Sequence, residues 1–117
     1  MDWHEKMNAA MDYIEDNLNG NIDIWKAARL AHCSEYHFRR MFSFVAGVPV
    51  SEYIRRRRMT LAALELQQTK STVEDVAKEY GYSSPDGFTR AFQSMHGISP
   101  SQVHENRYSV KAWPRMT

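Results

Sequence analysis

Apolar residues recur with a helical period along almost the whole chain. Five of them share one face of the first segment: Met7, Ala10, Met11, Ile14 and Leu18. Their spacing of i, i+3, i+4, i+7 and i+11 is typical of an amphipathic α-helix. The triplet "NGN" at 19–21 is expected to end this helix, with Gly20 in the left-handed conformation. No alternating pattern typical of a strand occurs before the last residues, "YSVKAW". The pattern therefore predicts an all-α protein.

Capping residues divide the remainder into further helices. A Ser, Thr, Asp or Asn before a helix accepts a hydrogen bond from its free backbone N–H groups. Such residues are Asn21 or Asp23, Ser34, Ser71, which has capping-box spacing to Glu74, and Ser84, which precedes Pro85. We expect helices over residues 24–31, 35–45, 51–67, 72–80 and 85–95, and a last short helix opened by "SPSQV".

The chain also contains an internal repeat at an offset of 50 residues. The matching pairs are Ala27 and Ala77, Ser34 and Ser84, Phe38 and Phe88, Arg40 and Arg90, Phe42 and Phe92, Gly47 and Gly97, and Ser51 and Ser101. Each copy is a short helix, a tight turn and a second helix opened by a capping serine. This is the layout of a helix-turn-helix, whose second helix enters the major groove of DNA.

The second helix of each copy has an apolar side and a polar side. The apolar sides are Phe38, Met41, Phe42 and Val45, and Phe88, Ala91, Phe92 and Met95. The polar sides are Tyr36, Arg39, Arg40 and Ser43, with His37 at the edge, and Asp86, Thr89, Arg90 and Gln93. We predict that these polar residues bind DNA, because arginine can donate two bonds to guanine and a tyrosine ring can meet a thymine methyl. An ordinary solvated helix face is the alternative.

The charge distribution favours a localised anionic partner. The net charge is only +1, but residues 1–24 hold one lysine against six acidic residues, and residues 35–60 hold six arginines against two glutamates. A helical protein-interaction module that binds an acidic protein is the alternative to DNA. A single cysteine, no secretory signal and no apolar run of about 20 residues favour a cytoplasmic protein without a membrane span.

The stretch "HCSEYHFRRMF" places His32, Cys33 and His37 close together, which raises the question of a metal site. At the offset of 50 these residues correspond to Tyr82, Ser83 and Gly87, so no candidate ligand recurs. A structural zinc site also needs about four ligands in paired spacing. We therefore predict no metal site and no cofactor. Motifs of enzymes, such as a glycine-rich phosphate loop or a nucleophile elbow, are absent, and we predict no enzymatic activity.

The sequence resembles the DNA-binding domain of the AraC/XylS family of bacterial transcription regulators. The likeness covers residues 5–108 and is carried by "MDYIEDNL", "SEYHFRRMF", "YIRRRRMTLAALEL" and "VAKEYGYSSPDGFTRAFQSMHGISPSQV". It implies two homeodomain-like helix-turn-helix subdomains, over 1–50 and 69–108, joined by a linker helix over 51–68. It also implies a monomeric DNA-binding unit that reads two successive major-groove segments of promoter DNA and activates transcription with RNA polymerase.

The resemblance also suggests which positions differ in role. Arg57 matches a family arginine whose role is structural, bonding acidic or carbonyl groups between subdomains, whereas Arg55, Arg56 and Arg58 are expected to be solvated or to face phosphates. Family members often carry longer polar side chains where Pro85 and Asp86 stand, so the first copy should dominate specificity. Residues 109–117 resemble the start of a junction to a gyrase-inhibitor-like effector domain, and an effector is expected only if such a domain exists. A frayed tail is the alternative.

Overall fold

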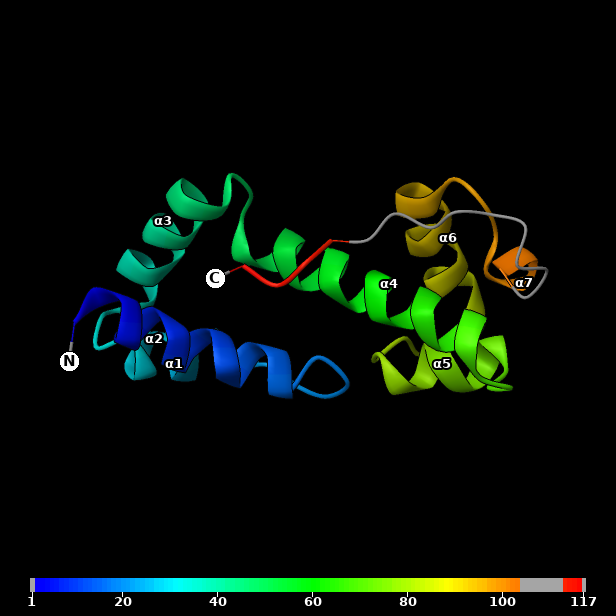
Figure 1. Ribbon diagram of the computed structural model, residues 1–117, viewed down its shortest axis with the longest axis horizontal. Helices are drawn as coiled ribbons and strands as arrows, with labels where there is room; N and C mark the ends of the chain where they lie inside the picture. Colours follow the sequence, from blue (N-terminus) through cyan, green and yellow to red (C-terminus); the bar gives the residue numbers. More distant parts are fainter. Residues whose placement is uncertain (1, 104–112, 117) are drawn as a thin grey trace. The chain divides into compact units, whose positions relative to one another are not determined.

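The computed structural model describes residues 2–103 and 113–116, and every regular element within these ranges is an α-helix (Figure 1). The helices are α1 (Trp3–Asp16), α2 (Ile24–Leu30), α3 (Glu35–Ala46), α4 (Val50–Gln68), α5 (Val73–Glu79), α6 (Pro85–His96) and α7 (Pro100–Val103). The predicted all-α class with about seven helices is confirmed. Within the described ranges, no helix combines the length and the apolar composition that crossing a membrane requires.

Most of the predicted helix ends are confirmed, and two are wrong. Asp23, Ser34 and Ser84 cap α2, α3 and α6 with their side chains. Helix α5, however, is capped by Thr72, whose Oγ1 accepts from the amide of Asp75, and not by the preceding serine. Helix α1 ends at Asp16 with Asn17 as its cap, and Gly20 is not among the glycines with positive φ. The chain therefore leaves α1 before the "NGN" triplet is reached.

The described residues divide into two compact units, and the division falls inside α4, between Arg55 and Arg56. The first unit contains α1, α2, α3 and the start of α4, together with Arg115 and Met116. The second contains the rest of α4, α5, α6, α7 and the segment that ends at Pro114. The limits 50, 68 and 108 predicted from the sequence stay predictions.

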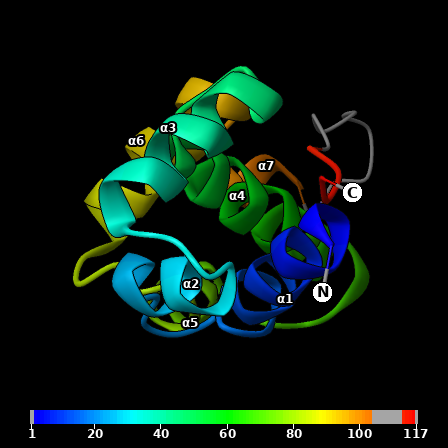
Figure 2. The same cartoon turned by 90° about the vertical axis from the view of Figure 1, so that its left-hand side faces the viewer.

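In the first unit α2 contacts both α1 and α3 (Figure 2). The predicted apolar face of α1 is fully buried, as are Phe38 and Phe42 of α3. Helix α4 adds Val50 and Tyr53 to this core, and the ring centroids of Tyr53 and Phe42 are 5.2 Å apart. The Tyr53 hydroxyl donates to Glu15 and accepts from the amide of Met116. This core fixes the inner side of α3 and so determines which residues of α3 face outward.

In the second unit the predicted apolar stripe of α4 is buried. Its members are Met59, Ala62, Ala63 and Leu66, which pack against Val76, Ala77, Tyr80, Phe88, Phe92 and Val103. His96, at the end of α6, is also buried, and its Nε2 lies 3.0 Å from the Met59 carbonyl oxygen. A polar ring with a hydrogen-bond partner costs little to bury. The end of α6 is thereby joined to α4.

Residues 113–116 return to the helices rather than fray. The amide of Trp113 donates to Thr60 Oγ1 at 2.8 Å, and its carbonyl accepts from Arg57 at 2.7 Å. In the first unit, Arg115 forms an ion pair with Asp12 at 2.6 Å. The predicted alternation in "YSVKAW" falls largely on residues 108–112, which lie outside the described residues. A frayed tail is therefore wrong for residues 113–116.

Candidate nucleic-acid interface

Helix α3 is held at both ends and along its inner side. Ser34 Oγ accepts from the amide of His37 at 3.1 Å, and Gly47 ends the helix with a φ of 79°. Only glycine adopts this left-handed conformation without strain. Phe38 and Phe42 are fully buried, so the inner side cannot rotate outward. The helix therefore presents one fixed set of side chains to the solvent.

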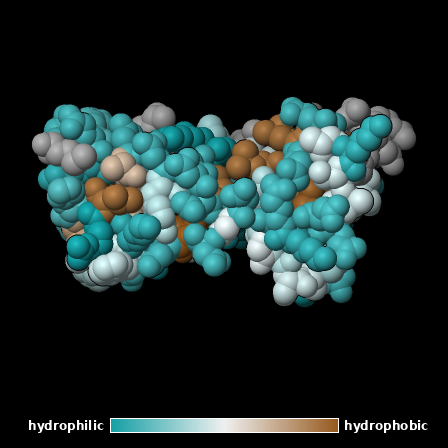
Figure 3. Space-filling view, turned by 90° about the horizontal axis from the view of Figure 1, so that it is seen from below, coloured by the Kyte–Doolittle hydropathy of each residue, from teal (hydrophilic) through white to brown (hydrophobic). Residues whose placement is uncertain are grey.

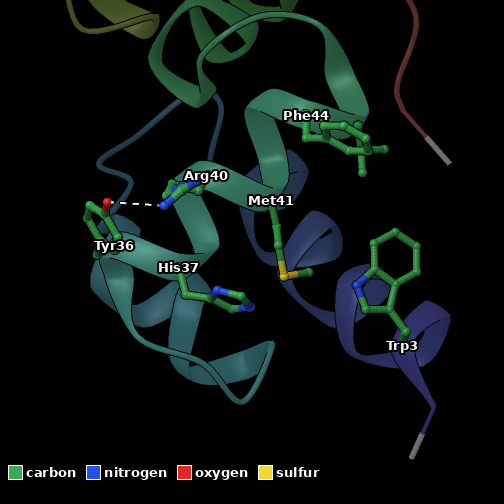
Figure 4. A pocket seen from close by; sticks show the side chains of 7 residues that line it. Trp3, Tyr36, His37, Arg40, Met41 and Phe44 are labelled. Carbon is green, nitrogen blue, oxygen red and sulfur yellow. Dashed lines mark hydrogen bonds between the residues drawn. The ribbon is translucent and has the colours of Figure 1, made fainter.

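The outward set of α3 contains the residues predicted to bind DNA. Tyr36, His37, Arg39 and Arg40 are exposed, and Ser43 is half-buried. Arg40 Nη1 donates to the Tyr36 hydroxyl at 3.3 Å, and the two side chains lie against each other (Figure 4). Arg39 forms a loose ion pair with Glu35 at 3.6 Å. An exposed pair of this kind contributes little to stability, so Arg39 can exchange Glu35 for a phosphate or a base at small cost.

Helix α6 repeats this construction with different chemistry. Ser84 Oγ accepts from the amide of Gly87 at 3.3 Å, and Phe88 and Phe92 are fully buried. Asp86, Arg90 and Gln93 are exposed and Thr89 is half-buried. Asp86, Thr89 and Arg90 together line an open hollow of about 380 Å³. The structure thus brings these three predicted residues together, but an acid replaces the tyrosine found beside the arginine in α3.

An apolar patch on the outer side of α3 was not predicted from the sequence. Phe44 is 91% exposed, and Val45, predicted to be part of the buried side, is 46% exposed. That prediction for Val45 is wrong because the helix ends one residue later, beyond the elements that cover Phe38 and Phe42. Phe44 could have been found from the sequence, because it stands one helical turn after Arg40.

The patch forms one wall of an open hollow of about 750 Å³ on the first unit. Trp3, at the start of α1, stands opposite α3 (Figure 4). The hollow is lined by Trp3, Tyr36, His37, Arg40, Met41, Phe44 and Val45. Three of the predicted DNA-binding residues therefore share this hollow with the apolar patch. The face of the molecule seen in Figure 3 is mainly hydrophilic, with separate hydrophobic patches.

The four arginines of α4 are not a free basic patch. All four are half-buried. Arg55 pairs with Glu52 at 2.6 Å, the Arg56 guanidinium lies 4.4 Å from the Trp113 ring centroid, and Arg57 donates to the Trp113 carbonyl. Burial lowers the pKa of Arg58. Arg55 and Arg56 thus have partners within the chain, and the expectation that Arg55, Arg56 and Arg58 are solvated or face phosphates stays a prediction. Arg57 bonds a carbonyl, as expected, but both partners belong to the second unit, so a role between subdomains stays a prediction.

The turns that precede α3 and α6 differ in length, so the residues before them correspond at a different offset than the sequence suggested. Helices α2 and α5 begin at Ile24 and Val73, an offset of 49, whereas α3 and α6 keep the offset of 50. His32, with a φ of 58°, therefore corresponds to Gly81, with a φ of 85°, and not to the tyrosine that follows it. The turn before α6 contains the one additional residue.

His32 and Cys33 lie in the turn between α2 and α3, and His37 lies in the first turn of α3. Among the described residues, no group of three or more His, Cys, Asp or Glu side chains is placed to hold a metal ion. Cys33 is half-buried in the turn, and burial raises the pKa of its thiol, an effect that the charge of Lys6 partly offsets. A thiol with a raised pKa is a poor nucleophile at neutral pH. Burial thus disfavours the reactive thiolate form of Cys33.

Comparison with known proteins gives consistent matches. A family model described as a helix-turn-helix domain matches residues 27–106. The Transposon Tn10 TetD protein of Escherichia coli is 37% identical over 95 residues, which are 81% of this chain and 69% of that protein. The HTH-type transcriptional activator AarP of Providencia stuartii is 39% identical over 89 residues, which are 76% of this chain and 66% of AarP.

A solved structure shares the fold. The transcriptional regulator from Chromobacterium violaceum, described as containing an AraC-type DNA-binding domain, has a TM-score of 0.81 and 23% identity to this chain. The match covers 89% of this chain and 93% of that structure. The two helix-turn-helix elements of this chain thus belong to a fold already known among regulators.

Proposed function

This chain belongs to the AraC family of helix-turn-helix DNA-binding transcription regulators, and from that premise we propose how it reads its site. Helices α3 and α6 enter two successive major-groove segments of promoter DNA. The observation that carries this proposal is their common construction. Each helix has a serine cap, two buried phenylalanines on its inner side and an exposed arginine, Arg40 or Arg90, on its outer side.

In this proposal α3 is the stronger reader. Tyr36 holds the Arg40 side chain by a hydrogen bond and by its ring, whose centroid lies 5.7 Å from the guanidinium carbon. An arginine whose geometry is partly fixed before binding loses less entropy when it binds a guanine edge. Arg39 supplies a second cation, and His37 and Ser43 lie at the sides of the face, where they can reach phosphates or base edges.

Helix α6 contributes less in this proposal because its outer face carries an acid. Arg90, Thr89 and Gln93 offer hydrogen-bond groups, but Asp86 repels the phosphates on either side of the groove. Asp86 is tolerated only where it accepts from a cytosine amino group. We therefore assign most of the base preference to Arg39 and Arg40, and the remaining part to Arg90.

Transcription activation through contact with RNA polymerase is part of the same proposal. It is supported by the likeness to AarP, which is named a transcriptional activator. A single chain already carries two reading helices, so the DNA-binding unit needs no second copy and acts as a monomer at the nucleoid. If the full-length protein carries a further domain, an effector would bind there.

The roles assigned to Arg40 and Arg57 can be separated by substitution. Arg40→Ala should weaken binding to a preferred duplex by about 1–3 kcal/mol, relax the preference at one base pair and leave thermal stability unchanged. Arg57→Ala should instead lower stability by about 1–3 kcal/mol, because the carbonyl of the half-buried Trp113 loses its donor. Below the unfolding temperature of Arg57→Ala, its base preference should match that of the unchanged chain. Full binding and unchanged preference in Arg40→Ala would contradict the proposal.

A further inference from the structure

Phe44 is the most exposed large apolar side chain among those described, with 91% of its surface open to solvent. It stands on a helix whose other phenylalanines are fully buried, and its counterpart in α6, at the offset of 50, is Ser94. The repeat therefore does not require an aromatic ring at this position. Met41 extends the apolar surface toward Trp3 (Figure 4), and Val45 lines the same hollow. An apolar surface of this kind on an otherwise hydrophilic helix face indicates a contact.

The position of Phe44 relative to Arg40 limits what that contact can be. Four residues advance an α-helix by about 6 Å and rotate it by about 40°, so both side chains leave α3 on the same side. Consecutive base pairs are about 3.4 Å apart along the duplex axis. A helix that places Arg40 on a base edge therefore places Phe44 about two base pairs further along the groove. At that distance the apolar group available in the major groove is the C5-methyl group of thymine.

We propose that Phe44, with Val45 beside it, forms an apolar surface on α3 that recognises a thymine methyl next to the base read by Arg40. This inference rests on the proposed function, because it assumes that α3 lies in the major groove. It adds a hydrophobic determinant of specificity to the readout face, that is, to the outward polar residues Tyr36, His37, Arg39 and Arg40 of α3. In the second copy the determinant is absent, because Ser94 carries no apolar surface to place against a methyl group.

Continuity with the readout face favours DNA over a protein partner as the occupant. Tyr36, His37 and Arg40 line the same hollow as Phe44 and Val45. A protein seated in this hollow would cover the residues that contact DNA and would compete with it. DNA can occupy both parts at once, since its major groove presents acceptors and methyl groups side by side.

The test uses uracil, which differs from thymine only by the missing methyl group. The probe is the tightest duplex that the full chain selects from a randomised pool, with each thymine replaced singly by uracil. Binding is measured by fluorescence anisotropy for the unchanged chain, Phe44→Ala and Phe44→Leu. Burial of one methyl group corresponds to about a fourfold change in affinity. We expect one uracil within about three base pairs of the Arg40-dependent position to weaken binding of the unchanged chain by about this factor.

The inference is tested by comparing the effect of the same uracil substitution on the unchanged chain and on the two Phe44 variants. In Phe44→Ala the same uracil should have no effect, whereas Phe44→Leu should keep most of it because leucine restores apolar contact. If the uracil effect persists undiminished in Phe44→Ala, or if no thymine near that position responds, the inference is overturned. Strong dependence on Arg40 without dependence on Phe44 would overturn the inference and leave the proposed function standing. Failure of the unchanged chain to select any duplex would contradict the proposed function itself. Phe44→Ala should fold normally, since the side chain is exposed.

Discussion

His32 adopts in the turn between α2 and α3 the left-handed conformation that Gly81 adopts in the turn between α5 and α6, with φ values of 58° and 85°. Both residues close the same pair of hydrogen bonds at a helix end. The amide of the next residue reaches back to a buried alanine carbonyl, from Cys33 to Ala28 in one turn and from Tyr82 to Ala77 in the other. This is the Schellman arrangement, in which glycine is the favoured residue. His32 is thus a glycine position occupied by a histidine.

Replacing His32 by glycine should therefore stabilise the first unit. The left-handed conformation costs a residue with a side chain about 1–2 kcal/mol. Glycine removes this cost, but it also raises the conformational entropy of the unfolded chain, which offsets part of the stabilisation. We expect a net stabilisation of about 0.5–1 kcal/mol, measured by urea unfolding. Gly81→Ala is the matched control and should destabilise the protein, although a Cβ there would meet no atom within 4 Å. Shifts of the same sign in both variants would contradict this account of the turns.

Glu65 provides a test in which stability depends on pH. Burial, and then the neighbouring Glu79 carboxylate, raise the pKa of Glu65 above its ordinary value. Its Oε2 atom is buried without a hydrogen-bond partner among the described residues. The folded state therefore holds the proton more tightly than the unfolded chain, so stability falls as the pH rises from the ordinary glutamate pKa through the raised value. At pH values above the raised pKa, Glu65 is charged in the folded state, and the full unfavourable free energy of burying this charge lowers stability.

Glu65→Gln should accordingly raise the thermal midpoint by a few degrees at neutral pH. The gain should shrink toward zero near about pH 3, well below the ordinary glutamate pKa, where the glutamate of the unchanged chain is protonated in both states. Differential scanning fluorimetry across this range measures both values. Glu74→Gln is the control, since Glu74 is exposed and lies beside Lys78. A gain that stays constant between the two pH values would contradict the role of the buried Glu65 charge.

Asp86 should weaken binding through its charge. Asp86→Asn keeps the shape of the side chain and removes the repulsion from phosphates, so affinity for random duplex DNA should rise by a few-fold at low salt. The gain should decrease as salt screens the charge. Asp16→Asn, an exposed site on α1, changes the net charge equally and is the control. Equal gains in both variants would show that only net charge matters and that Asp86 does not face DNA.

Much of this fold could be predicted from the sequence because each helix carries its own signals. The apolar period placed Met11 and Phe42 in the core, and Ser34 and Ser84 marked helix starts that the structure confirms. Sequence signals did not identify the correct residue where either of two adjacent residues could cap a helix or occupy the turn. Thr72, rather than the serine before it, caps α5, and the offset of 50 concealed the one-residue insertion in the second turn.

The candidate site was less predictable because exposure depends on residues distant in the chain. The arginines of α4 resembled a basic patch until Trp113, more than fifty positions later, proved to lie against Arg56 and Arg57. Phe44 follows Arg40 by one helical turn, so the sequence indicates that it lies on the outer side of α3, but it does not indicate that no other element covers the side chain. The polar faces of α3 and α6, by contrast, follow from helical geometry alone once Phe38 and Phe88 are placed inside.

We propose that α3 and α6 read successive major-groove segments, and site selection from a randomised duplex pool can show this. Two short blocks should be enriched, with their centres about one helical turn apart, roughly 10–10.5 base pairs. The more strongly conserved block should contain a guanine whose enrichment disappears when the selection is repeated with Arg40→Ala, while Arg90→Ala should affect only the other block. A single enriched block, or blocks that respond to neither substitution, would contradict the account.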